Sequence, residues 1–228
     1  MPLYNGDHTN DYEQRRREDQ GREAIVCDFL DNKVYPKMGI HPKRNTEKDT
    51  QLKGIDITFK LGGEEYLCDE KSAVRNGTKR LNTFCLELSH RPRGFYHNVD
   101  GWFFKEDNLT NSYMLVWVDG LRNDQWRSSE SITSAQVLLV RKKAILEWLE
   151  GQGISEERLR KLTSAMLEQG LDKYYLKLAN PYTEEDGKVV DSIKMVQLEY
   201  LSENPVNLLL PRSVYMQIAD RNRFIIQQ

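Results

Sequence analysis

The sequence predicts a single α/β domain organised around a mixed sheet flanked by helices. Apolar residues at helical spacing open the chain, a stretch of alternating apolar and polar residues follows, and strand-like and helix-like stretches are interleaved after it. A leading helix, then a hairpin, then several strands is not the order of a regular βαβ winding. The length of 228 residues fits one domain. We expect a core over about residues 11–140 and a C-terminal elaboration over about 141–228.

The first predicted element is a helix over residues 11–30. Val26, Phe29 and Leu30 lie on one apolar stripe at helical spacing, behind a strongly charged first half. Pro36 is expected to end this helix, because proline disfavours helical geometry in the residue before it.

A hairpin is predicted next. Residues 54–61 alternate between apolar and polar, Gly62 and Gly63 supply a tight turn, and residues 64–72 return as the second arm. Further strands are expected over 83–89, 101–105, 112–119 and 136–140, short apolar runs lie at 196–201 and 206–210, and helices are expected over 142–150, 155–169 and 212–220.

The composition excludes several classes of protein. Hydrophobic residues make up 39% and charged residues 30% of the chain, and no apolar run reaches the ~18 residues of a membrane span. The N-terminus has no apolar segment of the kind found in a signal peptide. The three cysteines form no CxxC pair, so we expect small buried side chains in a reducing compartment, the cytoplasm, at Cys27, Cys68 and Cys85.

Familiar catalytic motifs are missing from the sequence. It contains no GxxxxGK[ST], no HExxH, no GxGxxG and no GxSxG. These absences argue against a P-loop ATPase, a zinc hydrolase, an ordinary dinucleotide-binding enzyme and a hydrolase with a nucleophile elbow.

Positive charge gathers in one place although the chain as a whole carries a net charge of −2. Between residues 71 and 93 the one acid is Glu87, against six basic residues. Such a stretch is either a solvated loop or the contact surface for a polyanion such as nucleic acid. The candidate phosphate contacts in it are Arg75, Lys79, Arg80, Arg91 and Arg93.

The hairpin holds the most informative residues. Asp56 lies on the polar side of the first arm, and Asp69 and Lys71 emerge together from the second arm because positions i and i+2 of a strand share a side. A turn at residues 62–63 can bring Asp56 beside them. Two carboxylates with an adjacent ammonium suit Mg²⁺, which needs one or two carboxylates plus phosphate and water.

The predicted structural context distinguishes the acid-x-lysine pattern at Asp69 from the other copies of this pattern in the sequence. An acid two residues before a lysine also occurs at Asp31 and at Asp186, but one ends a helix and the other lies in a loop. The copy at Asp69 faces a strand-borne Asp across a glycine turn.

These residues resemble the PD-(D/E)XK nuclease superfamily, the restriction-endonuclease-like fold. The match consists of Gly54-Ile55-Asp56 and Asp69-Glu70-Lys71 and covers roughly residues 13–120, with Ile55 in place of the usual proline. The resemblance implies an α-β-β-β-α-β core and a Mg²⁺ cofactor that Mn²⁺ can replace. It also implies an endonuclease that hydrolyses nucleic acid, most readily DNA, and that often forms a homodimer. Asp56 and Asp69 would ligate metal, the Glu70 carbonyl would be a further ligand, Lys71 would assist the nucleophile or leaving phosphate, and Glu23 would supply an acid from the leading helix.

Other interpretations stay open at this point. Asp56 and Glu23 can be plain surface charge, and Asp69 with Lys71 can be a surface ion pair worth under ~1 kcal/mol. Glu87 either joins the acids or pairs with Arg80. A non-catalytic nucleic-acid-binding or assembly protein that keeps the same fold explains the basic stretch equally well.

Overall fold

The computed structural model describes residues 21–73, 81–91, 94, 96–118, 127–199, 201, 203–220 and 223–227. A helix over residues 21–29 runs into the π-helical turn η1 and then into α2. The elements in chain order are η1 (Leu30–Val34), α2 (Tyr35–Met38), β1 (Lys43–Arg44), α3 (Lys48–Leu52), β2 (Ile57–Leu61), β3 (Glu64–Ala73), β4 (Thr83–His90), β5 (Val99–Asp100), β6 (Ser112–Val118), η3 (Ser129–Ser131), β7 (Ser134–Arg141), α4 (Lys142–Gly151), α5 (Glu156–Gln169), β8 (Lys173–Thr183), β9 (Val189–Gln197), β10 (Val206–Pro211), α6 (Arg212–Ile218) and β11 (Arg223–Gln227).

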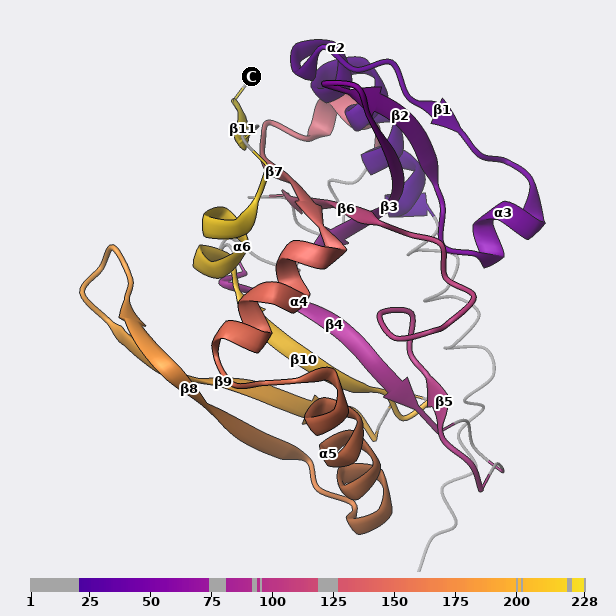
Figure 1. Ribbon diagram of the computed structural model, residues 1–228. Coiled ribbons are helices and arrows are strands. Elements are labelled where there is room, and N and C mark those ends of the chain that lie inside the picture. Colours follow the sequence, from indigo (N-terminus) through magenta and orange to yellow (C-terminus); the bar gives the residue numbers. More distant parts are fainter. Residues whose placement is uncertain are drawn as a thin grey trace, which may run out of the picture.

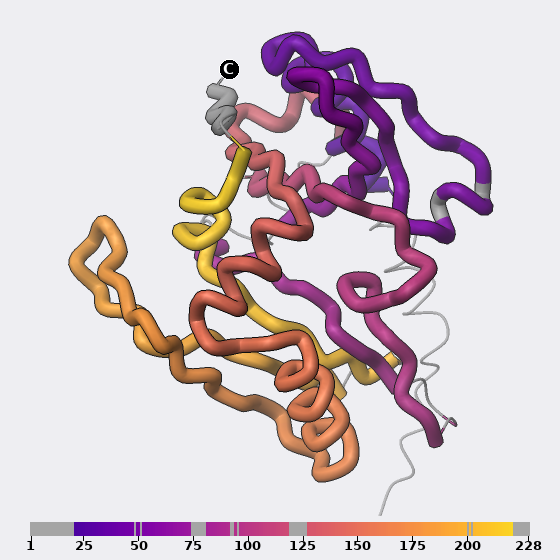
Figure 2. Tube along the Cα trace, in the orientation of Figure 1, coloured from indigo at the N-terminus to yellow at the C-terminus, as the bar shows by residue number. Residues whose placement is uncertain are grey.

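Two sheets make up the fold. Sheet A has six strands in the order β1-β2-β3-β6-β7-β11, and sheet B has five in the order β5-β4-β10-β9-β8. Sheet A is mixed, because β3 and β6 pair in parallel while its other pairs are antiparallel. Figure 1 shows β1–β3 and the first helix at one end of the molecule and sheet B at the other, and the Cα trace in Figure 2 follows the same arrangement. The predicted α/β class with a mixed sheet is confirmed, and sheet B was not predicted.

The hairpin β2–β3 forms where the sequence predicts it. Gly62 and Gly63 both have positive φ, +62° and +86°, which suits the two-residue turn that matches the twist of the flanking strands. Because this turn sets the register, Ile57 lies opposite Cys68 and Leu61 opposite Glu64. The first arm is shorter than expected, since β2 begins at Ile57 and the residues before it form a turn.

One face of sheet A packs against the first helix. Val26, Phe29 and Leu30 of that helical segment are buried, as their spacing predicts, against Ile57 of β2 and Val116 of β6. Each such side chain stabilises the fold by about 1.5–3 kcal/mol through loss of apolar surface to water. This face is therefore a closed apolar layer.

The opposite face of sheet A packs against sheet B, α4, α5 and α6. Leu86 of β4, Trp117 of β6 and Ile145 of α4 belong to this larger cluster, and all three are fully buried. Figure 1 shows α4 and α5 in front of the sheets. The helix α5 has the predicted ends: the Ser155 hydroxyl accepts from the Arg158 N–H at 3.2 Å, and Gly170 follows in the left-handed conformation.

Three expectations from the sequence are wrong, and the strand β8 was missed. The first helix does not end before Pro36, because this residue stands in the first turn of α2, where a missing N–H costs nothing. Residues 101–105 form turns and no strand. Strand β8 was not expected, since it is an exposed edge strand that buries few side chains. Cys85 is exposed, whereas Cys68 is buried as predicted.

No helix in the described part of the chain is long and apolar enough to cross a membrane.

Candidate functional site

Asp56 lies next to Asp69 at the end of the β2–β3 pairing. The Asp56 N–H donates to the Cys68 carbonyl at 3.0 Å, beside the Ile57–Cys68 pair at which the register of β2 and β3 ends. The Asp56 carboxylate then accepts the Glu70 N–H through Oδ2 at 2.8 Å. Asp56 is thus held at the start of β2, with one carboxylate oxygen fixed by the backbone of β3.

A turn before β2 sets the position of Asp56. Gly54 has a φ of +74°, and a Cβ atom there would lie 2.6 Å from Oδ1 of Asn108. The hydroxyl of Thr110 donates to the Gly54 carbonyl, and the Asn108 side chain donates to the Trp102 carbonyl at 2.7 Å. The segment 101–110 therefore packs against the backbone that leads into Asp56. It lies so close to Gly54 that a residue with a side chain would not fit there.

Asp69 and Lys71 point to the same side of β3. The Lys71 Nζ lies 2.9 Å from Oδ1 of Asp69, whose side chain is 4% exposed. The ammonium also lies 5.2 Å from the ring centroid of Trp102. A carboxylate this deeply buried would be costly without a cation beside it, so Lys71 is part of what keeps Asp69 in place.

Two carboxylates lie next to each other here, and their electrostatics reflect it. Burial raises the pKa of the Asp69 carboxyl to about 7; Lys71 opposes this rise, and the charge of Asp56 and a hydrogen bond with Asp56 add to it. Burial lowers the pKa of Lys71, but the charges of Asp69, Asp56 and Glu23 outweigh it, so that the net shift is upward. Lys71 is therefore a charged ammonium at neutral pH, and among the described side chains it is the cation paired with Asp69.

A pocket of about 520 Å³ opens beside Asp56. Its walls are the first helix, with Glu23 and Cys27, the segment that includes Arg44, and the adjoining part of β3. Glu23 is an exposed side chain that faces the same pocket as Asp56 and acts electrostatically on Lys71. The structure thus brings the sequence-predicted Glu23 to the acids, without a direct hydrogen bond among the described contacts.

Glu70 has a different environment from its neighbours. Arg44 donates to its carboxylate through Nη1 at 2.6 Å and Nη2 at 3.2 Å, and the Tyr35 hydroxyl donates to it as well. The Cys27 thiol lies 3.6 Å from its Oε2. The Glu70 side chain therefore points away from Asp69 and Lys71 toward the first helix, and it is the Glu70 backbone that lies next to Asp56.

Arg44, Tyr35 and Trp102 were not identified from the sequence. Arg44 comes from a polar stretch that is typical of a loop, and Tyr35 stands beside the proline that was expected to end the helix. Trp102 lies in the segment 101–105 that was expected to be a strand, and its contact with Lys71 could not be predicted because it depends on the return of residues 101–111 to the hairpin.

Of the predicted phosphate contacts, the structure describes Arg91. Its Nε donates to Asn98 at 2.8 Å and its Nη1 to the Leu167 carbonyl at 3.1 Å, so this side chain links β4 to the end of α5. The other four lie outside the described residues: Arg75, Lys79, Arg80 and Arg93.

Glu87 lies close to the site but has its own partner. Its Oε1 is 3.2 Å from Nδ1 of His90. Burial raises the pKa of Glu87, and the charges of His90 and Lys71 oppose the rise. Glu87 is thus within electrostatic reach of Lys71 while its carboxylate is bound to His90.

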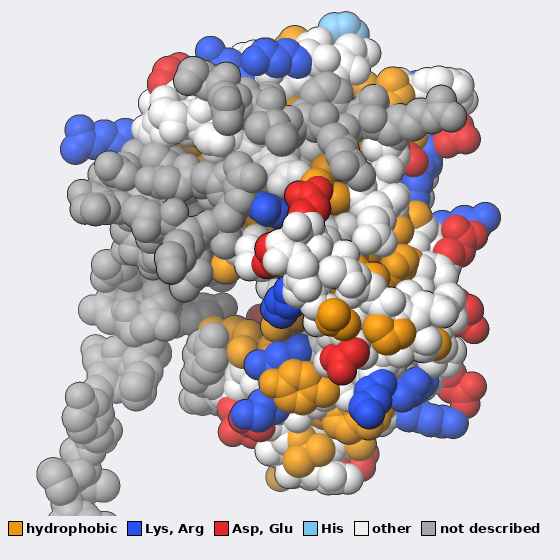
Figure 3. Space-filling model, turned by 90° about the vertical axis from the view of Figure 1, so that its left-hand side faces the viewer, with side chains coloured by type: hydrophobic (Ala, Val, Ile, Leu, Met, Phe, Trp, Pro, Cys, Tyr) orange, Lys and Arg blue, Asp and Glu red, His pale blue; other side chains and the backbone are white. Residues whose placement is uncertain are grey.

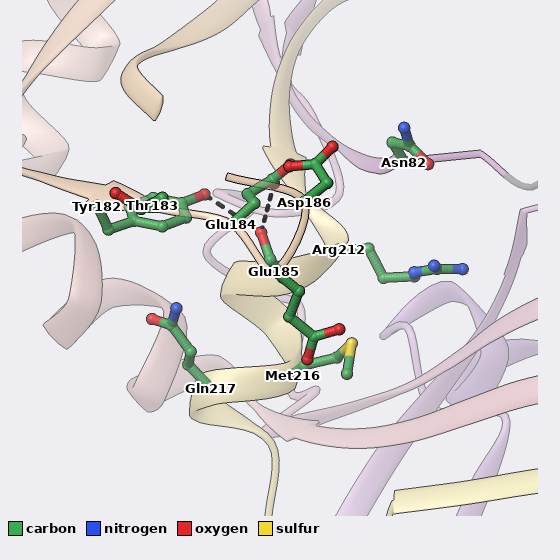
Figure 4. Close-up of a pocket in the computed structure, with 10 residues that line it drawn as sticks. Asn82, Tyr182, Thr183, Glu184, Glu185, Asp186, Arg212, Met216 and Gln217 are labelled. Atoms are coloured by element: carbon green, nitrogen blue, oxygen red, sulfur yellow. Dashed lines mark hydrogen bonds between the residues drawn. The ribbon is translucent and has the colours of Figure 1, made fainter. Parts of the chain in front are cut away.

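A second pocket, shown in Figure 4, is lined by a different set of residues. It has a volume of about 320 Å³ and is lined by the tip of the β8–β9 hairpin and by α6, where Ser213 donates to Glu184 at 2.8 Å. It shares no lining residue with the pocket beside Asp56.

Within the described part of the chain, no three or more His, Cys, Asp or Glu side chains are arranged to hold a metal ion. Two carboxylates are nevertheless enough for Mg²⁺ when phosphate and water complete the coordination. Asp56 and Asp69 are the two carboxylates that could act as such ligands; the pKa of Asp69 is raised mainly by burial and further by the neighbouring Asp56.

Comparison with known proteins finds no matching family model, no matching curated protein and no matching solved structure.

Proposed function

We propose that this protein is a divalent-metal-dependent nuclease that hydrolyses phosphodiester bonds in nucleic acid, with DNA as the first substrate to test. The observation that carries the proposal is that the side chains of Asp56 and Asp69 lie within hydrogen-bond reach of each other, with the Lys71 ammonium 2.9 Å from Asp69. Hard cations prefer carboxylate oxygen, and a fixed ammonium beside them can stabilise the charge of a phosphoryl group.

The order of the first elements supports the resemblance to the PD-(D/E)XK nucleases. A helical segment is followed by β1, the short helix α3, β2 and β3, and then by a crossover to β6, which pairs in parallel with β3. A parallel pair requires such a crossover. In the α-β-β-β-α-β order a helix fills it, whereas here the described part of the crossover contains β4 and β5 of sheet B.

Each residue has a definite task in this proposal. Asp56 and Asp69 would hold Mg²⁺ or Mn²⁺, which would supply Lewis-acid stabilisation and lower the pKa of the attacking water. Lys71, kept charged by Asp69, donates to a phosphate oxygen and stabilises the negative charge that develops there. Glu23 faces the pocket beside Asp56, where it can orient water. The barrier to be lowered is upwards of ~15 kcal/mol, so loss of either aspartate should nearly abolish turnover.

The test is cleavage of supercoiled plasmid and of labelled single-stranded DNA and RNA in Mg²⁺ and in Mn²⁺, with EDTA as the chemical control. We expect cleavage by the wild type, and a loss of about 100-fold or more in Lys71→Ala. Lys188→Ala is the matched control, because Asp186 and Lys188 repeat the acid-x-lysine spacing on an exposed turn. Equal cleavage by wild type and Lys71→Ala would contradict the proposal.

Metal titration separates this function from a non-catalytic binding protein. The nuclease proposal expects Mn²⁺ to bind and Asp56→Asn to weaken that binding, measured by calorimetry or by electron paramagnetic resonance. Absence of any Asp56-dependent metal binding, together with intact substrates, would favour the non-catalytic alternative.

A further inference from the structure

The two faces of sheet B differ in character. The inner face is apolar: Leu86 of β4 lies opposite Leu208 of β10, which lies opposite Met195 of β9, and all three are buried. Side chains directly opposite each other in antiparallel strands point to the same side, so the intervening residues point outward.

The outer face is described by two rows of paired residues. One row runs from Cys85 through Leu209 and Lys194 to Tyr175. The next row consists of Glu87, Asn207, Val196 and Lys173. These rows expose Cys85, Lys173 and Tyr175, whereas Asn207 is buried. They cross four strands, a width of about 15 Å at the usual strand spacing.

This outer face begins next to the proposed catalytic residues. The charge of Lys71 acts on both Cys85 and Glu87, the outward-pointing residues of β4. The segment that carries Trp102 also touches β4, because the Phe103 N–H donates to the Glu87 carbonyl at 3.1 Å. A chain lying across the outer face from β8 toward β4 would therefore arrive at Lys71.

The far end of this face is basic and aromatic. Tyr175 is 58% exposed, and the Lys194 ammonium lies 6.0 Å from its ring centroid. Lys173 and Lys177 are exposed on the same side of β8. From Lys173 to Lys177 on β8 and from Ser192 to Val196 on β9, the outward positions carry no acid. Figure 3 shows Lys and Arg side chains interspersed with hydrophobic ones on the lower part of this side of the molecule.

We propose that the outer face of sheet B binds single-stranded nucleic acid and leads it to the carboxylate pair. A base stacks on the exposed ring of Tyr175, and the lysines of β8 and β9 contact phosphates on either side. Stacking on an aromatic ring requires a base that is free of its own stack, which favours single strands over duplex. The proposal deepens the proposed function by naming its substrate, and the binding itself does not require the metal.

Exposed lysines on an edge strand also have a simpler explanation. The β8 strand is the last of sheet B, and lysine on such a strand prevents pairing with other chains. That explanation requires neither an aromatic ring nor a basic residue on the inner strand β9. Tyr175 and Lys194 are therefore the side chains that distinguish a binding face from a protected edge.

The test is fluorescence anisotropy with labelled single-stranded DNA, single-stranded RNA and duplex DNA in EDTA, where cleavage cannot occur. We expect Tyr175→Ala to weaken single-strand binding by about five- to 100-fold. Lys194→Ala should lower the slope of log K against log salt by about 0.7 for each phosphate that the Lys194 ammonium neutralises. The matched control is Tyr174→Ala, since Tyr174 lies on the same strand but opposite Met195 on the inner side.

Unchanged binding in Tyr175→Ala, an equal loss in Tyr174→Ala, or tighter binding of duplex than of single strands would each overturn the proposal. The DNA and RNA arms distinguish which nucleic acid is preferred. If binding depends on Tyr175 but the protein cleaves no substrate, the proposed binding surface would stand and the proposed nuclease function would be wrong. If Lys71→Ala abolishes cleavage while Tyr175→Ala leaves binding unchanged, the nuclease function would stand and the proposed binding surface would be wrong.

Discussion

Asp69 and Glu70 are adjacent acids that point to opposite faces of β3, and their side chains have different partners. Glu70 is bound by Arg44 from two nitrogens and by the Tyr35 hydroxyl, and Arg44 also binds Asp31 at 2.6 Å. Among the described residues, Asp69 has one cation beside it, Lys71, and it lies next to the carboxylate of Asp56. Burial raises the pKa of both carboxyls, so burial alone does not distinguish Asp69 from Glu70; among the described side chains, the two acids differ in the partners that compensate their charge.

The largest expected effect contrasts these two acids in catalysis. Asp69→Asn should reduce cleavage by about 1,000-fold or more, because it removes charge from the proposed metal site. Glu70→Gln should reduce it by less than about ten-fold, because the Glu70 backbone contact with Asp56 remains. Single-turnover cleavage of a labelled oligonucleotide measures both. A similar loss in the two variants would break the comparison and make the Glu70 carboxylate part of the site.

The second effect concerns stability. Arg44→Met should lower the free energy of unfolding by about 3 kcal/mol, because it leaves Glu70 buried without its cation. The double variant Arg44→Met/Glu70→Met should recover most of this loss. Urea denaturation of the wild type, Arg44→Met, Glu70→Met and the double variant completes the cycle. If the double variant is as unstable as Arg44→Met alone, the pair does not act as a unit.

The third effect is a pH dependence. Folding raises the pKa of the Asp69 carboxyl from 3.8 to about 7, mainly through burial, so the folded chain binds this proton more tightly than the unfolded chain. The stability contribution of Asp69 therefore falls as pH rises through this interval and stays low above it. Asp69→Asn should melt higher than wild type at pH 8 in EDTA, by the order of 5 °C, with no difference near pH 4.

Thermal melts followed by circular dichroism at both pH values measure this difference. Asp186→Asn on an exposed turn is the control and should show none. A lower melting temperature of Asp69→Asn at pH 8 would mean that Lys71 compensates Asp69 fully, and the contrast with Glu70 would disappear.

The smallest effect tests the ring beside the ammonium. Trp102→Leu removes a cation–π contact with Lys71 worth about 0.5–1 kcal/mol. Cleavage should fall only by a few-fold, since Asp69 still holds Lys71. A loss as large as that of Lys71→Ala would make Trp102 essential to the position of the ammonium. Steady-state kinetics with oligonucleotide substrate resolve the two outcomes.

The site core could be predicted because it is local. Asp56 and Asp69 are joined by one hairpin, and two glycines with positive φ fix its register within a few residues. Glu23 could be placed because it lies on a helix whose apolar stripe shows which side packs on the sheet.

Sheet B could not be predicted, because its pairs join distant segments. Cys85 pairs with Leu209 through an alternating pattern that fits many partners equally well. Strand β8 buries Leu176 and Leu178 but exposes most of its other residues, which leaves too weak a periodicity to detect. The partners of Glu70 were missed for the same reason, since Arg44 approaches it from a two-residue strand.

Sheet B pairs strands that lie far apart in the sequence, and this separation has a consequence for biosynthesis. Strand β4 emerges early, but its partner β10 is made about 120 residues later. At ~5–20 residues per second the ribosome needs several seconds to supply it. During that time Phe84, Leu86 and Leu88 form an apolar strand with an open edge. Slower growth at low temperature or a co-expressed holdase should therefore raise the soluble yield of the recombinant protein.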